Sequence, residues 1–138
     1  MLVEDDPDDE ALTLRVLRKR NLVCAIDVAR DGAEALKKLL GDGETGGAGL
    51  PQVVLLDLKL PKVDGLEVLK CLRENERTAT MPVVVLTSSD EERDIVQSYR
   101  LGANSYVRKP VDFEDFASAV DQLGLYWLAL NRVPESTR

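Results

Sequence analysis

The chain has 138 residues, of which 44% are hydrophobic and 31% are charged, a size and composition that suit one folded domain and argue against a disordered chain. The formal net charge of −7 and the pI near 4.7 imply an acidic surface, which would repel a phosphate backbone and argues against direct nucleic-acid binding. The absence of histidine excludes histidine metal ligands, histidine general bases and a phosphohistidine intermediate.

The sequence also bears on the cellular compartment. No apolar run approaches the length of a membrane span, and residues 1–6 lack the basic and apolar regions of a signal peptide. Cys24 and Cys71 lie in apolar stretches without metal-ligand spacing, so we interpret them as buried thiols in a reducing compartment rather than as a disulfide. We therefore expect a cytoplasmic protein that does not contact a membrane.

Strand-like and helix-like segments alternate along the chain. In chain order, the patterns predict strands over 1–4, 23–29, 52–56, 82–86 and 105–107, each followed by a helix, over 7–20, 32–40, 65–74, 90–101 and 113–131. The third and fourth strands are nearly continuous aliphatic runs, which is typical of strands buried on both faces. Five successive strand–helix pairs predict a doubly wound α/β fold, in which helices cover both faces of a five-stranded parallel sheet.

Two segments depart from this regular pattern. Residues 1–4 are short for a central strand, which typically has about five or six residues, so we expect the natural protein to have several residues ahead of Met1. The sequence of the source gene settles this expectation. Residues 41–51 are rich in glycine and predict a flexible surface loop rather than a linker, so residues 1–138 are expected to form a single domain.

Polar side chains follow four of the expected strands. In open parallel sheets, ligands bind at the carboxyl ends of the strands, so these side chains should lie together at one edge. They are Glu4, Asp5 and Asp6 after the first strand, Asp57 after the third, Thr87, Ser88 and Ser89 after the fourth, and Lys109 after the fifth.

This group of residues has a chemical interpretation. Carboxylates held close together repel one another unless a cation joins them, and oxygen ligands without cysteine or histidine favour a hard ion such as Mg²⁺. Asp57 could attack phosphorus and form an acyl phosphate. Mg²⁺ and Lys109 would neutralise the oxygens of the phosphoryl group, and Thr87 could donate a hydrogen bond to one of them.

Each of these residues also has an ordinary explanation when it is taken alone. Acids at residues 4–9 suit a helix N-terminus, an aspartate after a strand is most often a cap or turn residue, and Lys109 before a proline could be a surface residue. The interpretation as a site depends on the agreement of all these residues at successive strand ends.

The chain resembles the receiver domains of response regulators, the CheY-like superfamily, over almost its whole length. The residues that carry the resemblance are 2–6, 55–65, 85–89 and 102–110. The pattern D-x-x-L-P-x-x-D-G from Asp57 to Gly65, combined with a later strand-end threonine and a Lys-Pro pair, is specific. The resemblance implies a flavodoxin-like (βα)5 fold with the strand order 2-1-3-4-5.

Position by position, the resemblance implies a role for each polar residue at the edge of the sheet. Asp5 would bind Mg²⁺ directly and Glu4 through water. Asp57 would be the phosphoacceptor and a metal ligand, and the backbone carbonyl of Lys59 would be the third protein ligand.

The resemblance implies further roles beside the acceptor. Thr87 would follow the phosphoryl group, Lys109 would pair with it, and the rotamer of Tyr106 would report the state of Thr87. The bond between Lys109 and Pro110 is expected to be cis.

The function implied is that of a signalling switch rather than a metabolic enzyme. A partner histidine kinase would phosphorylate Asp57 in a Mg²⁺-dependent reaction, and the surface around the fourth helix, fifth strand and fifth helix would change its partners. The domain itself would catalyse only phosphotransfer and its own dephosphorylation. Because Lys59 and Ser89 are not obvious bases for water, we expect slow self-hydrolysis; a half-life of seconds would contradict this. No output domain is expected to follow the fifth helix.

The last helix has a narrower resemblance, to single-domain regulators that serve phytochrome-type histidine kinases. This resemblance is carried by residues 112–116 and 122–128, and the glycine-rich loop fits it. Residues 123–130 are apolar except for Gly124, so apolar side chains surround the helix, whereas a helix that packs one face on a sheet needs only an apolar stripe. We interpret Leu125, Tyr126 and Trp127 as an interface, most simply of a homodimer; the alternative is a C-terminal tail that covers them.

The sequence also bears on three other functions. A magnesium phosphatase that uses an aspartyl phosphate would carry a second aspartate where Lys59 stands. A flavin-binding protein would have a phosphate-binding loop after the first strand, where acids stand instead. A phosphorylation-independent binding module of the same fold is the alternative to the phosphorylated switch.

Overall fold

A computed structural model describes residues 1–19, 25–41 and 49–134. In this part of the chain a parallel sheet of five strands has the order β2-β1-β3-β4-β5, which confirms the predicted fold class and strand order. The strands are β1 (Leu2–Val3), β2 (Val28–Ala29), β3 (Val54–Leu56), β4 (Val83–Thr87) and β5 (Ser105–Arg108).

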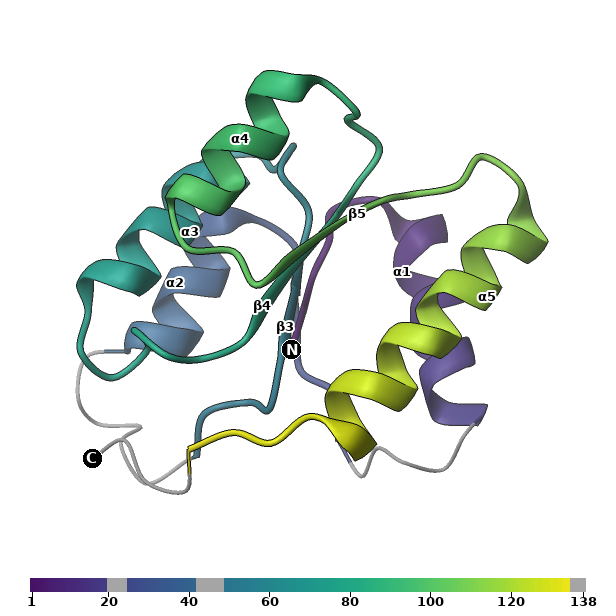
Figure 1. The fold of residues 1–138 in the computed structure, drawn as a ribbon, viewed down its shortest axis with the longest axis horizontal. Helices are drawn as coiled ribbons and strands as arrows, with labels where there is room; N and C mark the ends of the chain where they lie inside the picture. The colour runs from purple at the N-terminus through teal and green to yellow at the C-terminus, as the bar shows by residue number, and fades with distance from the viewer. Residues whose placement is uncertain (20–24, 42–48, 135–138) are drawn as a thin grey trace.

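Helices cover both faces of the sheet (Figure 1). They are α1 (Pro7–Lys19), α2 (Gly32–Leu40), α3 (Gly65–Glu74), α4 (Glu92–Arg100), α5 (Phe113–Gly124) and the π-helix η1 (Leu125–Leu130). α1 and α5 lie side by side on one face, and α2, α3 and α4 lie on the other (Figure 1). None of the helices that the structure describes is both long and apolar enough to span a membrane.

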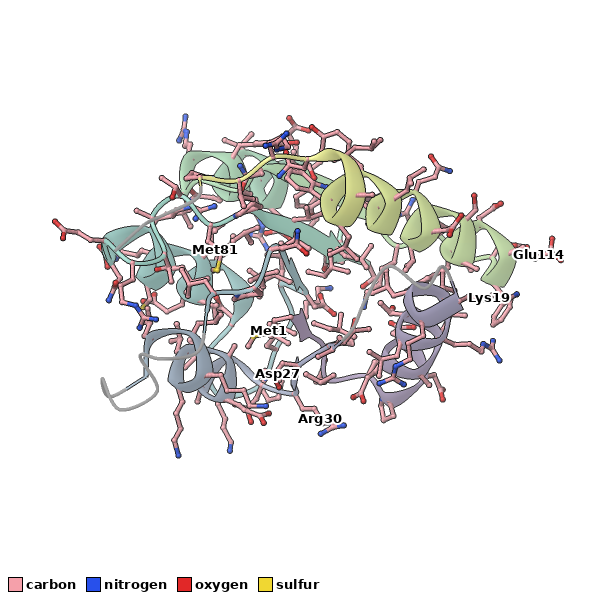
Figure 2. The ribbon with its side chains drawn as sticks, turned by 90° about the horizontal axis from the view of Figure 1, so that it is seen from below. Met1, Lys19, Asp27, Arg30, Met81 and Glu114 are labelled. Atoms are coloured by element: carbon pink, nitrogen blue, oxygen red, sulfur yellow. The ribbon has the colours of Figure 1, made fainter. Side chains whose placement is uncertain are left out.

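The core consists of two apolar layers, because successive side chains of a strand point to opposite faces. Leu55 and Val84 belong to the layer under α1 and α5, whereas Leu56 and Val85 belong to the layer under α2, α3 and α4. Met81 points into the second layer in Figure 2, in agreement with its burial. Both faces of the central strands are therefore apolar, and polar side chains emerge only at the strand ends.

The C-terminal helix differs from the single regular helix expected over 113–131. α5 ends at Gly124, and Leu125–Leu130 continues as a π-helix, closed by a hydrogen bond from the Asn131 N–H to the Tyr126 carbonyl at 2.6 Å. At Gly124 a Cβ atom would lie only 2.8 Å from Leu17 Cδ2, so the glycine permits the close approach of α5 to α1.

Other boundaries shift by a few residues. α4 begins at Glu92 rather than at residue 90, β3 begins at Val54, and β2 begins at Val28. The expected start of the second strand, the end of the first helix and Cys24 lie outside the described residues, as do residues 42–48 of the glycine-rich loop. Cys71 is a free thiol that is only partly buried, so the prediction of a buried thiol is wrong for Cys71.

Candidate active site

The predicted site residues lie together at the carboxyl edge of the sheet. Glu4 follows β1, Asp57 follows β3, Thr87 ends β4 and Lys109 follows β5. These four side chains are buried, whereas Asp5 is exposed. The parallel strands deliver them to one place because β1, β3, β4 and β5 are successive neighbours in the sheet.

Lys109 occupies the centre of this group. Its Nζ atom lies 2.6 Å from Glu4 Oε1, 2.9 Å from Asp57 Oδ2 and 2.9 Å from Asp9 Oδ2. Burial alone would lower the pKa of Lys109, but the contacts with these carboxylates raise that pKa, so the ammonium stays charged. No cis peptide bond occurs in the described ranges, so the predicted cis bond before Pro110 is wrong: Lys109 reaches the acids across a trans bond.

Both carboxylate oxygens of Asp57 accept hydrogen bonds. Oδ1 accepts from Thr87 Oγ1 at 2.8 Å and from the Lys59 N–H at 3.2 Å, and Oδ2 accepts from Lys109 Nζ. Burial by itself opposes ionisation, but the charge and hydrogen bond of Lys109, with the bonds from Thr87 and Lys59, hold the pKa of Asp57 below its usual value. Asp57 is therefore an ionised carboxylate, the form that can act as a nucleophile.

The acids beside Asp57 form a set that could hold a divalent cation. Glu4, Asp5 and Asp57 each place a carboxylate oxygen within 4.8 Å of the other two. Burial raises the pKa of Glu4 to about 7, and the contact with Lys109 only partly offsets this effect. A hard cation would relieve the repulsion among these oxygens, so the residues fit such an ion.

The loop between β3 and α3 is held close to the acceptor. The Gly65 N–H donates to the Leu58 carbonyl at 2.8 Å, and a Cβ atom at Gly65 would lie 2.3 Å from the Asp57 carbonyl oxygen. Asp64 caps α3 by accepting from the Glu67 N–H at 2.9 Å. The aspartate and glycine of the sequence pattern thus fix the path of the loop that contains Lys59.

The loop between β4 and α4 connects the site with Tyr106. The Tyr106 hydroxyl donates to the Ser89 carbonyl at 2.8 Å, and Ser89 Oγ donates to Asp94 Oδ2 at 2.5 Å. The Tyr106 hydroxyl thus bonds to the residue two positions after Thr87. Burial raises the pKa of Tyr106, so its hydroxyl keeps its proton and remains a donor.

The residues predicted as an interface lie away from this site. α5 starts beside the carboxyl edge of the sheet and runs back toward the other end (Figure 1). The π-helix η1, which contains Leu125, Tyr126 and Trp127, follows α5 directly. Tyr126 is 48% exposed and Leu125 is 36% exposed, whereas Trp127 packs partly against the core layer under α5. Val133, in the described part of the C-terminal tail, is also exposed.

The model of the response regulator receiver domain family matches residues 1–121. The chain belongs to this family. Receiver domains are the components of two-component systems that act as signalling switches, so the function is signal transduction rather than metabolic catalysis.

Two regulatory proteins match almost the whole chain. The probable methanogenesis regulatory protein FilR2 of Methanothrix harundinacea is 44% identical over 97% of this chain and 86% of its own. Response regulator Rcp1 of Synechocystis sp. is 37% identical over 97% of this chain and 91% of its own.

Solved receiver structures have the same fold. The Mn²⁺-bound form of Rcp1 matches with a TM-score of 0.90 over 96% of both chains. The phosphorylated cyanobacterial phytochrome response regulator RcpA matches at 36% identity with a TM-score of 0.91, over 97% of this chain and 96% of that one. The bacteriophytochrome response regulator AtBRR matches at 52% identity with a TM-score of 0.71, over 95% of both.

Two residues at this receiver site were not singled out from the sequence. Asp9 contacts Lys109, and Asp94 accepts the hydrogen bond from Ser89. The role of Asp9 could have been predicted from the sequence. Asp9 lies in the first turn of α1, so its side chain lies near the helix N-terminus and hence near the strand ends. The contact of Asp94 with Ser89 could not have been predicted, because an acid in the first turn of a helix is common without any further contact.

Proposed function

We propose that this receiver domain accepts a phosphoryl group on Asp57 in a Mg²⁺-dependent reaction. The observation that carries the proposal is the ionised Asp57, bonded through one oxygen to Thr87 and through the other to Lys109. Glu4 and Asp5 supply further oxygens within reach of a cation, and the carbonyl of Lys59 is proposed as the third protein ligand.

The proposed chemistry follows from these contacts. A carboxylate oxygen of Asp57 attacks the phosphorus, and the bond between phosphorus and the leaving group of the donor breaks. When it is bound, Mg²⁺ supplies positive charge to the phosphoryl oxygens. Lys109 pairs with one phosphoryl oxygen and Thr87 donates to another, because both side chains already contact the carboxylate. Attack of water on phosphorus later releases inorganic phosphate and restores Asp57.

We propose a histidine kinase as the phosphoryl donor, and specifically a phytochrome-type kinase. The support is the similarity to RcpA and AtBRR, which are response regulators of phytochromes. Residues 1–138 are proposed to act as one domain, and the cytoplasmic location and the lack of nucleic-acid binding stay predictions.

We propose that the domain passes its signal to other proteins through the face formed by α4, β5 and α5. We also propose that two copies of the chain form a homodimer through this face. A shallow groove on this face is lined by Ser105, Val107, Tyr126 and Trp127, among others. Apolar side chains that are partly exposed beside an edge strand suit a contact with a second chain. The residues proposed as interface are Leu125, Tyr126 and Trp127.

Intact-mass measurement after incubation with acetyl phosphate tests the proposed chemistry. Wild-type protein with Mg²⁺ should gain the mass of one phosphoryl group, and the gain should be lost in Asp57→Asn or when a chelator removes Mg²⁺. Asp64→Asn is the matched control, because Asp64 lies at the same edge but caps α3. A folded wild type that gains no mass would contradict the proposal and favour a phosphorylation-independent binding module.

A further inference from the structure

The tip of the β3–α3 loop is a strained turn. Lys62 has a φ angle of 70°, a left-handed conformation that residues with a Cβ atom rarely adopt. The Val63 N–H donates to the Pro61 carbonyl at 2.8 Å, so this hydrogen bond spans only two residues and closes a γ-turn around Lys62. A γ-turn with a positive φ at its centre is strained, and it persists only where neighbouring groups hold it.

The start of α2 lies directly against this turn. The Gly32 N–H donates to the Pro61 carbonyl at 3.3 Å, and Gly32 is buried. A Cβ atom at Gly32 would collide with the Val63 carbonyl oxygen and lie 2.8 Å from Val63 Cβ. Only a glycine at this position therefore leaves room for the turn in its present place.

The turn is joined to the residue proposed as the third metal ligand. Pro61 follows Lys59 by two residues, and the Lys59 N–H donates to Asp57 Oδ1 at 3.2 Å. The base of the loop is closed by the bond from the Gly65 N–H to the Leu58 carbonyl at 2.8 Å. A movement of the tip therefore changes the position of the Lys59 carbonyl relative to the carboxylates of the site.

We infer that Gly32 is a positioning residue for the metal site: it lets α2 pack against the γ-turn and so keeps the Lys59 carbonyl where a cation can bind it. This role rests on the proposed function, in which that carbonyl is a metal ligand. Gly32 contributes no side chain to the site, so its effect on metal binding passes through the turn.

The direction of the effect follows from the room at Gly32. A methyl group there would push the turn and α2 apart, and a displaced carbonyl is a poorer ligand because a cation requires its ligand distances to within about 0.2 Å. Disturbing groups that hold metal ligands in place costs roughly tenfold to a hundredfold in metal affinity. We therefore expect Gly32→Ala to bind Mg²⁺ about tenfold more weakly than wild type.

General destabilisation has to be separated from this role. Gly102 has a φ angle of 101°, and a Cβ atom there would lie 2.9 Å from Arg73 Cγ, so Gly102→Ala also strains the backbone and displaces a neighbour. Gly102 precedes β5, at the edge of the sheet opposite to the site, whereas Lys109 follows β5. Gly102→Ala is thus the matched control, because it should lower stability without changing Mg²⁺ affinity.

The first measurement is Mg²⁺ affinity by isothermal titration calorimetry, on variants whose folding is checked by circular dichroism. Gly32→Ala should bind about tenfold more weakly than wild type, and Gly102→Ala should bind as wild type does. The Mg²⁺ concentration that gives half the maximal rate of phosphoryl gain from acetyl phosphate should rise by the same factor in Gly32→Ala. At saturating Mg²⁺ the rate should change little, because the nucleophile Asp57 and its partners Thr87 and Lys109 are intact.

The second measurement uses only the wild type, so it does not depend on the folding of a variant. The Gly32 N–H donates to the Pro61 carbonyl, and the Gly102 N–H donates to the Tyr99 carbonyl at 3.0 Å. A cation that requires the loop in place must, by linkage, stabilise the contact that holds the loop. Mg²⁺ should therefore slow hydrogen exchange of the Gly32 amide more than that of the Gly102 amide, as followed by NMR.

The outcomes separate the role of Gly32 from the proposed function. A wild type that neither binds Mg²⁺ nor gains a phosphoryl group removes the proposed function and this role with it. Equal Mg²⁺ affinities of wild type and folded Gly32→Ala, or an equal weakening in Gly102→Ala, would overturn only the role of Gly32. So would a wild type that binds Mg²⁺ while the exchange of the Gly32 amide slows no more than that of the Gly102 amide.

Discussion

At the scale of single residues, the site depends on one lysine that forms ion pairs with three carboxylates. Lys109 contacts Glu4, Asp9 and Asp57, and its side chain is only 7% exposed. Without that ammonium, carboxylates at the edge of the sheet would face one another with little water to screen them. Breaking a buried ion pair by removing one partner is strongly destabilising, because the remaining charge is uncompensated.

The variant Lys109→Met should therefore lower the free energy of unfolding by about 3 kcal/mol in the presence of a chelator. Urea denaturation at neutral pH measures this change. Mg²⁺ should raise the free energy of unfolding more in the variant than in wild type, because the cation would neutralise the carboxylates in place of the missing ammonium. Lys62→Met is the control, because Lys62 is 70% exposed and should change stability little. Equal stability of Lys109→Met and wild type in chelator would contradict the account.

Gly65 is the second residue whose identity the site requires. The variant Gly65→Ala should lose about 2 kcal/mol of stability, because its Cβ atom would lie 2.3 Å from the Asp57 carbonyl oxygen and the backbone must shift. Gly49→Ala is the matched control, since no atom lies within 4 Å of its added Cβ. Chemical denaturation of both variants measures the effect; a Gly65→Ala protein as stable as Gly49→Ala would be inconsistent with the close approach.

How much of the site the sequence predicts depends on the kind of contact. Asp57, Thr87 and Lys109 were predictable because strand ends in a parallel sheet converge, and the structure brings them within hydrogen-bond distance. Asp94 was not, because its contact depends on the path of a loop. The trans bond before Pro110 was also missed, because the isomer depends on that local path.

At the scale of elements, helix caps place the loops around the site. The side chain of Asp31 caps α2 by accepting from the Glu34 N–H at 2.7 Å. This hydrogen bond is the main reason why the pKa of Asp31 lies below its usual value, and Lys62 contributes less. Helices α2 and α3 have the predicted bounds, and a capping aspartate marks the start of each. The start of α4 was predicted two residues too early, and this helix has no side-chain cap.

The cap predicts a specific pH dependence. Because the pKa of Asp31 is lower in the folded protein, its charge contributes stability above the unfolded pKa of about 4, and this contribution is lost as the pH falls through the folded value. Asp31→Asn keeps a capping acceptor but not the charge. The stability difference between wild type and Asp31→Asn should therefore shrink as the pH falls from about 5 to about 3.

Denaturant unfolding across that pH range measures the difference. Lys62→Met should retain most of the pH dependence, because the backbone hydrogen bond is the larger cause. A difference between Asp31→Asn and wild type that stays constant with pH would contradict this explanation of the cap.

At the scale of the whole molecule, the alternation of strands and helices was sufficient to predict the sheet. Nearly continuous aliphatic runs such as residues 82–86 indicated strands covered on both faces, and the structure has both apolar layers. The π-helix Leu125–Leu130 could not be predicted, because its residues suit a regular helix equally well.

The proposed homodimer makes a prediction at this scale. Tyr126→Asp should weaken self-association at least tenfold without unfolding the protein, because Tyr126 is 48% exposed and a buried unpaired charge opposes association. Sedimentation over a range of concentrations measures the effect. Ala11→Asp, on the exposed side of α1, is the control. A wild type that is a monomer at every concentration, with and without phosphorylation, would rule out the dimer.

Chemical trapping identifies which residue carries the phosphoryl group, which we propose is Asp57. Borohydride reduces an aspartyl phosphate to homoserine, so peptide mass mapping after phosphorylation and reduction identifies the modified residue. We expect homoserine at position 57 alone, and only when Mg²⁺ is present during phosphorylation. Homoserine at another aspartate, or an unmodified Asp57 in protein that has gained a phosphoryl group, would contradict it.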